Sequence, residues 1–325
     1  MMAVCPDYIP SSMPPGIFLR HTLRWGACAL FLWTASWGNR GVAQEAPPPA
    51  TPPVAPAPEP ASAAAPQPGR MQPQAKTPEE AAALQAFLAE QNPDQRIRLV
   101  EDFLLSYPET ELKESAYQAA MQAYQAKNDF EHLLTYGELV LEQNPENITT
   151  LLTLAAAISE MTGRNDADRD EKLAAGDQYA RQALDVLGRL RKPPGFPEEQ
   201  WNEARRESES AAHAARGLMA LIREDFVLAE LELKEAVALT KKPDTALLYR
   251  LGMTYSFQKK YSEALGVLDQ AASLGGIKID AGGGNTRDVV AEAREFAAKA
   301  LAASAPPRVP EAPAPVGEPQ PSLVP

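Results

Sequence analysis

Few residues of this chain could do chemistry by their type and spacing. Its 325 residues include three histidines, His21, His132 and His213, and two cysteines, Cys5 and Cys28. No second histidine follows His132 four residues later, so the spacing of a zinc-protease helix is absent. The sequence also lacks the G-x-S-x-G motif of a serine nucleophile and the G-x4-G-K-[ST] phosphate loop. We therefore expect no catalytic residue, no cofactor and no metal, and we expect that the protein is not an enzyme.

Two loop segments resemble ligand-binding patterns only in part. Residues 165–170 resemble the start of a calcium loop, but the glycine turn and the distal glutamate of that loop are missing. Residues 282–287 are glycine-rich and could hold an anion on backbone amides, but no lysine and no preceding strand accompany them. We expect a solvated insertion between helices at 165–170 and a flexible loop at 282–287.

Two single residues also have a functional and a structural interpretation. Asn147 begins an Asn-Ile-Thr glycosylation sequon, yet it stands at a repeat boundary where an asparagine is expected to cap a helix. Trp201 follows the loop 193–196 and could form a platform for a ligand. We expect Asn147 to cap a helix and Trp201 to pack against that loop.

The amino terminus has the parts of a targeting segment. Arg20 and Arg24 precede a largely apolar run of 13 residues, 25–37, and small residues follow at 41–43. This order is typical of a secretory signal peptide, which predicts cleavage after Ala43 and export to the periplasm, the cell envelope or the medium. The alternative is a retained membrane anchor, but a membrane span needs about 20 apolar residues.

Cleavage would change the charge and the thiol content of the chain. It removes three arginines and one aspartate, so the net charge goes from −12 to −14, and it removes both cysteines. A strongly acidic chain is a poor ligand for phosphates, which excludes nucleic acid as the expected partner. A mature chain without cysteine offers no disulfide and no thiol chemistry.

The prolines divide the chain into segments. Of 31 prolines only 7 lie in the 225 residues between 79 and 303, while 12 lie in 44–78 and 8 in 304–325. We expect a signal peptide at 1–43, a disordered Pro/Ala-rich linker at 44–76, a folded body at 77–303 and a disordered Pro-rich tail at 304–325. The proline-rich segments are either spacers, which we favour, or tethers and ligands for a proline-binding groove.

The folded body contains a helical repeat. Its clearest unit has the spacing of two antiparallel helices in close contact, with small residues where the helices cross and large residues in the seam: Leu248-x2-Leu251-Gly252-x2-Tyr255, then Ala264-x3-Leu268-x2-Ala271. This spacing resembles the tetratricopeptide repeat, W-x2-L-G-x2-Y and A-x3-F followed by a proline. Leu248 stands at the tryptophan position, and Gly276 stands where the proline usually falls.

Other units follow in register. Phe87 precedes Pro108 by 21 residues, and Tyr124 precedes Pro145 by the same distance, as in the aromatic-to-proline spacing of the repeat. A fourth unit is offset by 35 residues from the clearest one, although Arg216 replaces an expected leucine. These registers predict five units, at 77–110, 114–147, 148–190, 210–243 and 245–278.

Two helices depart from the regular pattern. A helix with Pro197 in its first turn is expected to run to about Ile222, which is much longer than a repeat helix. A last helix at 287–303 is expected to begin at a Thr286 cap and to turn Val289, Ala293 and Phe296 inward, closing the array. The resemblance therefore implies an all-α solenoid of antiparallel helix pairs with a C-terminal capping helix.

The resemblance also implies a binding groove. The first helix of each tetratricopeptide pair lines the concave face, and this geometry selects eight residues: Tyr249, Arg250, Met253, Ser256 and Phe257 in the fifth unit, and Gln118, Gln122 and Gln125 in the second. This set lacks the Lys/Asn residues with which some relatives hold a carboxylate terminus. Aromatic and Met side chains beside amides suit an apolar or extended peptide. The alternative is that Met253 and Phe257 are covered by the last helix.

Two functions are compatible with these features. The first is an exported interaction scaffold that binds a protein or an extended peptide in the concave groove, without a stable membrane span after cleavage. The alternative is a structural subunit of a cell-envelope assembly, held through its convex face and tails. The identity of the partner is not encoded in any motif of the chain.

Overall fold

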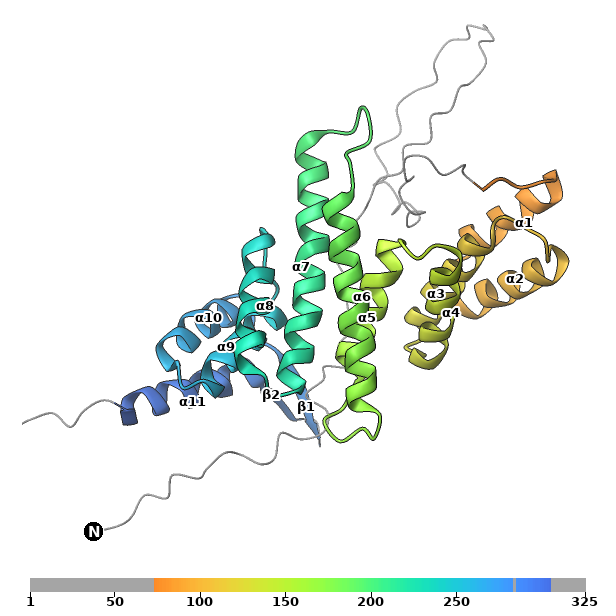
Figure 1. Ribbon diagram of the computed structural model, residues 1–325. Helices are drawn as coiled ribbons and strands as arrows, with labels where there is room; N and C mark the ends of the chain where they lie inside the picture. Colours follow the sequence, from red (N-terminus) through yellow and green to blue (C-terminus); the bar gives the residue numbers. More distant parts are fainter. Residues whose placement is uncertain (1–72, 283–284, 305–325) are drawn as a thin grey trace, which may run out of the picture.

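The computed structural model describes residues 73–282 and 285–304 (Figure 1). The predicted signal peptide at 1–43 lies outside these residues, as do most of the 44–76 linker and nearly all of the 304–325 tail. The described part contains eleven α-helices and one two-stranded hairpin. No helix in it is both long enough and apolar enough to cross a membrane.

The helices follow one another with short connections. Their bounds are α1 (Pro78–Ala89), α2 (Pro93–Ser106), α3 (Lys113–Ala126), α4 (Phe130–Gln143), α5 (Ile148–Met161), α6 (Arg169–Arg189), α7 (Glu198–Ile222), α8 (Phe226–Leu239), α9 (Thr245–Phe257), α10 (Tyr261–Ser273) and α11 (Val289–Ser304). The strands β1 (Lys278–Gly282) and β2 (Asn285–Asp288) lie between α10 and α11.

Most helices begin at a side chain that accepts a hydrogen bond from a backbone N–H of the first turn. Six helices have such a cap, namely Thr77, Asn92, Asp129, Asn147, Asp225 and Asp244. These caps satisfy donors that a helix leaves unpaired at its start. The Asn147 side chain accepts from the Thr150 N–H at 3.0 Å, as the capping interpretation of the sequon expects.

The helices form consecutive antiparallel pairs, α1/α2 to α9/α10, and α11 follows as a single helix. These pairs correspond to the five units expected from the sequence. First helices also contact one another along the array: α1 with α3, α5 with α7, α7 with α9, and α9 with α11. The molecule is therefore an all-α solenoid of the tetratricopeptide type.

Two glycines show the repeat register directly. A Cβ atom on Gly252 would lie 2.6 Å from Cγ of Leu268, and a Cβ on Gly217 would lie 2.6 Å from Cγ of Leu233. Both pairs join the first helix of a unit to its second helix, and both glycines and both leucines are 35 residues apart along the chain. The absence of a side chain at these positions is what allows the two helices to approach.

The core contains residues that were predicted from the repeat pattern. Phe87 and Tyr124 belong to an N-terminal cluster around α1–α4. A C-terminal cluster around α8–α11 includes six residues predicted from the clearest unit: Leu248, Leu251, Tyr255, Ala264, Leu268 and Ala271. Pro108 and Pro145 lie in the turns that follow α2 and α4. A third cluster joins α5, α6 and α7 through residues that include Ala155, Leu173 and Met219.

The pair α6/α7 is longer than the others. Helix α6 has 21 residues and α7 has 25, against 12 to 14 in the other repeat helices, and their joined ends extend beyond the neighbouring pairs in Figure 1. Trp201, near the start of α7, packs edge-to-face on Phe196 of the connecting loop with ring centroids 6.3 Å apart. The indole is buried there, as expected for packing against the loop.

The connection to α11 differs from the sequence prediction. Thr286 does not cap the last helix but lies in β2, and Asp288 instead accepts from the N–H of Val290 at 3.0 Å. The same carboxylate accepts from the Ile277 N–H at 3.2 Å and lies so close to Gly276 that a Cβ there would be 2.1 Å from it. The hairpin could not be predicted from the sequence, because a glycine-rich stretch is typical of a loop. On α11 itself, Phe296 is 46% exposed although the sequence predicted that it would face inward.

Candidate protein-interaction surface

The inner side of the array is where the first helices of successive pairs approach one another. The eight residues predicted for a groove lie on two of these helices, α3 near one end of the array and α9 near the other. The structure therefore does not bring the two sets together in one pocket. They lie on the same series of helices, separated by α5 and α7.

The α3 end presents amide side chains. Gln122 and Gln125 are half-buried, so part of each side chain reaches the surface. Gln118 is only 7% exposed and belongs to the packing between helices. Gln118 therefore offers little side-chain surface to a partner, contrary to its prediction as an accessible groove residue.

At the α9 end, Tyr249 and Met253 pack against the C-terminal cluster of α8–α11. Burial raises the pKa of the Tyr249 phenol to about 12, and the charges of Glu292 and Arg287 also act on it. These two charges belong to α11 and to β2. The structure thus places Tyr249 beside the last helix.

The other α9 residues also have partners within the chain. Arg250 forms an ion pair with Glu160 of α5, and the two side chains are only 23% and 18% exposed. Phe257 stacks on Phe226 of α8, not on α11, with ring centroids 4.9 Å apart. Ser256 is 6% exposed and donates its hydroxyl to the Gly252 carbonyl at 2.9 Å, so its prediction as an accessible groove residue is wrong.

A buried charge network lies on α6, α7 and α8, and sequence reasoning missed it. Arg216 donates to Asp177 at 2.9 Å and to Glu232 at 2.6 Å, and Nδ1 of His213 lies 2.7 Å from the other Glu232 oxygen. The Glu232 side chain is 5% exposed and that of Arg216 is 16% exposed. Arg216 stands where the repeat expects leucine, and Glu232 supplies the opposite charge. This charged residue at a leucine position was the sequence signal that could have indicated the network. Because its charges are paired internally, this network positions helices.

An apolar surface on α8 was also missed. Val227 and Leu231 are 75% and 65% exposed and stand four residues apart, so they lie on the same face of the helix. No other element of the described residues covers them. Helix α8 is the second helix of its pair, and this face is therefore on the outer side of the array.

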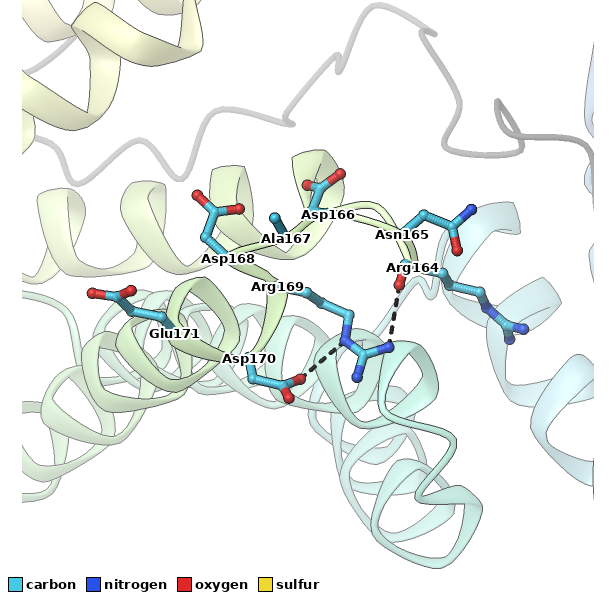
Figure 2. Close-up of a pocket in the computed structure, with 8 residues that line it drawn as sticks. All are labelled: Arg164, Asn165, Asp166, Ala167, Asp168, Arg169, Asp170 and Glu171. Atoms are coloured by element: carbon cyan, nitrogen blue, oxygen red, sulfur yellow. Dashed lines mark hydrogen bonds and ion pairs between the residues drawn. The ribbon is translucent and has the colours of Figure 1, made fainter.

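The segment at 165–170 does not gather its carboxylates. Residues 164–171 line a shallow depression, in which Asp166, Asp168 and Asp170 point in different directions (Figure 2). Asp166 accepts from the Gly163 N–H at 3.0 Å, and Lys172 lies 2.9 Å from Asp168. Among the described residues no group of three or more His, Cys, Asp or Glu side chains could hold a metal ion.

Lowered carboxyl pKa values in the array have structural causes. Hydrogen bonds from Lys127, Lys172 and Lys260 lower the pKa values of Asp94, Asp168 and Glu230, respectively. Each shift has a single lysine as its main cause, and the three carboxyls lie far apart along the chain.

No protein-family model matches the chain, and no curated protein matches it. The fold is of the tetratricopeptide type. Similar solved structures include PilW, a type IV pilus biogenesis factor, with 18% identity over 70% of this chain and 88% of PilW and a TM-score of 0.47.

Two other solved structures are similar to this chain. The tetratricopeptide repeat protein TTC0263 of Thermus thermophilus has 20% identity over 69% of this chain and 99% of its own, with a TM-score of 0.37. PilF of Pseudomonas aeruginosa has 14% identity over 68% of this chain and 88% of its own, with a TM-score of 0.44. The fold assignment itself rests on the helix pairs and the glycine–leucine contacts of this chain.

Proposed function

We propose that the protein is an exported, non-catalytic scaffold that binds an extended segment of a partner protein along the inner side of its helical array. The observation that carries this proposal is the series of contacts between first helices, α1 with α3 and then α5 with α7, α7 with α9 and α9 with α11, which defines the inner side of the array. An extended segment suits such a side because it can contact several repeats at once.

The side chains on the inner side favour a partner segment that offers its polar main chain and apolar side chains. Gln122 and Gln125 are partly accessible amides that can donate to carbonyls and accept from N–H groups of a peptide. Met253 and Phe257, both half-buried, supply polarisable and aromatic surface at the other end. Arg250 is engaged by Glu160, so a partner carboxylate would have to displace an existing ion pair.

Photo-crosslinking tests this proposal in cells. A photoreactive residue at position 122 is expected to capture a discrete partner, because Gln122 is accessible on α3. The same group in place of Lys234, an exposed residue of α8 on the outer side, is the matched control. Adducts from position 234 with none from position 122 would contradict binding on the inner side.

Export is the part of the proposal that concerns residues 1–43. The order of basic, apolar and small residues supports cleavage after Ala43. We expect mass spectrometry of envelope material to find an amino terminus at or near Gln44. An intact terminus at Met1 or Met13 in a cytosolic fraction would be incompatible with export.

A structural subunit of a cell-envelope assembly is the second candidate. The exposed Val227 and Leu231 favour it, because a covered apolar pair on the outer side would stabilise a permanent contact. In that case the protein would purify only as a stoichiometric complex, and the outer side would carry the contact.

A further inference from the structure

One ion pair connects two helices of the array that are not neighbours. Arg250 of α9 donates to Glu160 of α5, although α7 lies between these two first helices. The residues are 90 positions apart along the chain, and each is the other's only ion-pair partner among the described residues. Their side chains are 23% and 18% exposed, so salt screens their charges less than it screens a surface pair. We therefore expect the pair to restrain the two helices.

The ion pair requires that the inner side be curved at α7. Neighbouring packed helices lie roughly 8–10 Å apart, so two helices on either side of a third are nearly twice as far apart when all three lie in one plane. An arginine and a carboxylate form an ion pair only within about 4 Å. Because Arg250 and Glu160 both belong to first helices, their side chains meet on the inner side, past α7. Flattening the array would pull them apart.

A second ion pair at the same end of α5 restrains the array less. Arg164, four residues after Glu160, pairs with Glu224 of the α7–α8 turn at 3.1 Å. These two side chains are 42% and 61% exposed, and exposed pairs contribute little. The connection between α5 and the later helices therefore depends mainly on Arg250 and Glu160.

The inner side of α7 is poorly accessible beside this ion pair. Leu218 of α7 stands 35 residues before Met253 of α9, at the same position of the repeat. Leu218 is 6% exposed, whereas Met253 is half-buried. A partner segment on the inner side would therefore reach this part of α7 only after α5 and α9 move apart.

We propose that Arg250 and Glu160 form a strap that holds α5 and α9 together past α7, and that this strap fixes the curvature of the array and closes its inner side at α7. Loss of the strap lets the array open. The strap is a property of the folded chain alone, so it can be tested without a partner, and its test is separate from that of the proposed function.

Distances between spin labels test the strap in the full chain. Cys5→Ser and Cys28→Ser remove both native thiols, and Gln122→Cys with Met253→Cys then carries the labels on α3 and α9, on either side of α5 and α7. Pulsed electron paramagnetic resonance gives the distribution of distances between the two labels. Each variant is compared in this background.

Removal of the strap should lengthen this distance. Arg250→Gln with Glu160→Gln removes both charges at once and leaves no unpaired buried charge. The mean label distance should increase by about 4–5 Å, roughly half the spacing of packed helices, and its distribution should broaden. The charge-exchanged chain, Arg250→Glu with Glu160→Arg, should recover the short distance because it restores the ion pair.

An ion pair within one helix provides the matched control. Arg205 and Glu209 form an Arg–Glu pair whose side chains are 38% and 20% exposed, but both belong to α7 and connect no second helix. Arg205→Gln with Glu209→Gln should leave the distance between the labels on α3 and α9 unchanged.

A second pair of labels reports on the part of the array before the strap. Gln85→Cys on α1 and Glu131→Cys on α4 are at exposed positions, and their distance should not change when the strap is removed. If it changes as much as the distance from α3 to α9, the ion pair stabilises the whole fold and not its curvature, and the inference is wrong. It is equally wrong if the distance from α3 to α9 is the same with and without the strap, or if the charge-exchanged chain stays open.

Discussion

At the scale of single residues, small side chains at helix crossings determine whether the array can form. Gly252 faces Leu268 with no room for a Cβ, whereas Gly266, on the next helix of the same pair, has nothing within 4 Å of the position of a Cβ. Substitutions at these two glycines therefore distinguish the effect of close helix packing from the general destabilisation that a glycine causes within a helix.

Substitution at these two glycines should change stability in opposite directions. Gly252→Leu is expected to lower the free energy of unfolding by roughly 1–3 kcal/mol or more, because the buried Leu268 cannot move away, and Ala264→Leu should act similarly. Gly266→Ala should raise it by about 0.5–1 kcal/mol. Urea denaturation measures all three. A Gly252→Leu chain as stable as the unmodified chain would show that the repeat register is wrong.

The burial of Tyr249 leads to a pH dependence. Its pKa of about 12 in the folded chain exceeds the value of about 10 in an unfolded chain. Below pH 10 the phenol is protonated in both states, and as the pH rises towards 12 the unfolded state loses its proton first, so stability falls. The loss from this residue should reach about 1.4 kcal/mol between pH 8 and pH 11.

Tyr249→Phe should remove this part of the alkaline destabilisation. Urea denaturation at pH 8 and at pH 11 compares the two chains, and the variant should lose less free energy of unfolding than the unmodified chain. An identical loss in both would mean that the phenol is open to water, as a free groove residue would be.

At the scale of helices, the ion pair of Arg250 and Glu160 joins α9 to α5 across the intervening pair. We expect a double-mutant cycle of Arg250→Gln and Glu160→Gln to give a coupling of about 1 kcal/mol, because both side chains are mostly buried. Arg164 and Glu224 form a matched control, since their side chains are 42% and 61% exposed and should couple by less than about 0.5 kcal/mol. A coupling near zero for the first pair would leave Arg250 free for a partner.

The helix pairs could be predicted from sequence because their determinants are local. The spacing of Gly252, Ala264 and Leu268 fixes one pair by itself, and Asn147 marks the start of another helix. The partner of Arg250 is 90 residues away in the chain, so no local pattern indicates it. The burial of Gln118 and Ser256 could not be predicted either, because the exposure of a helix residue depends on the packing of the whole array and not on a local pattern.

At the scale of the whole molecule, charge is distributed unevenly. The first two pairs, residues 78–143, carry an excess of carboxylates, including Glu101, Asp102 and Glu138, whereas cations nearly balance carboxylates from Arg164 onward. Since Gln122 and Gln125 lie within the acidic part, a partner segment with basic side chains would be attracted to this end of the inner side. Raising the salt concentration should then slow association there.

The most direct test of the proposed function is quantitative capture of partners from envelope extract by the mature chain. Gln122→Lys with Gln125→Lys changes the inner side, and Val227→Lys with Leu231→Lys is the matched change on the outer side. We predict that the inner-side variant loses a stoichiometric partner by about tenfold or more, which corresponds to about 1.4 kcal/mol, while its melting temperature and the capture by the outer-side variant stay unchanged. Full capture by the inner-side variant, with loss in the outer-side variant, would contradict the scaffold proposal and favour the envelope-subunit alternative.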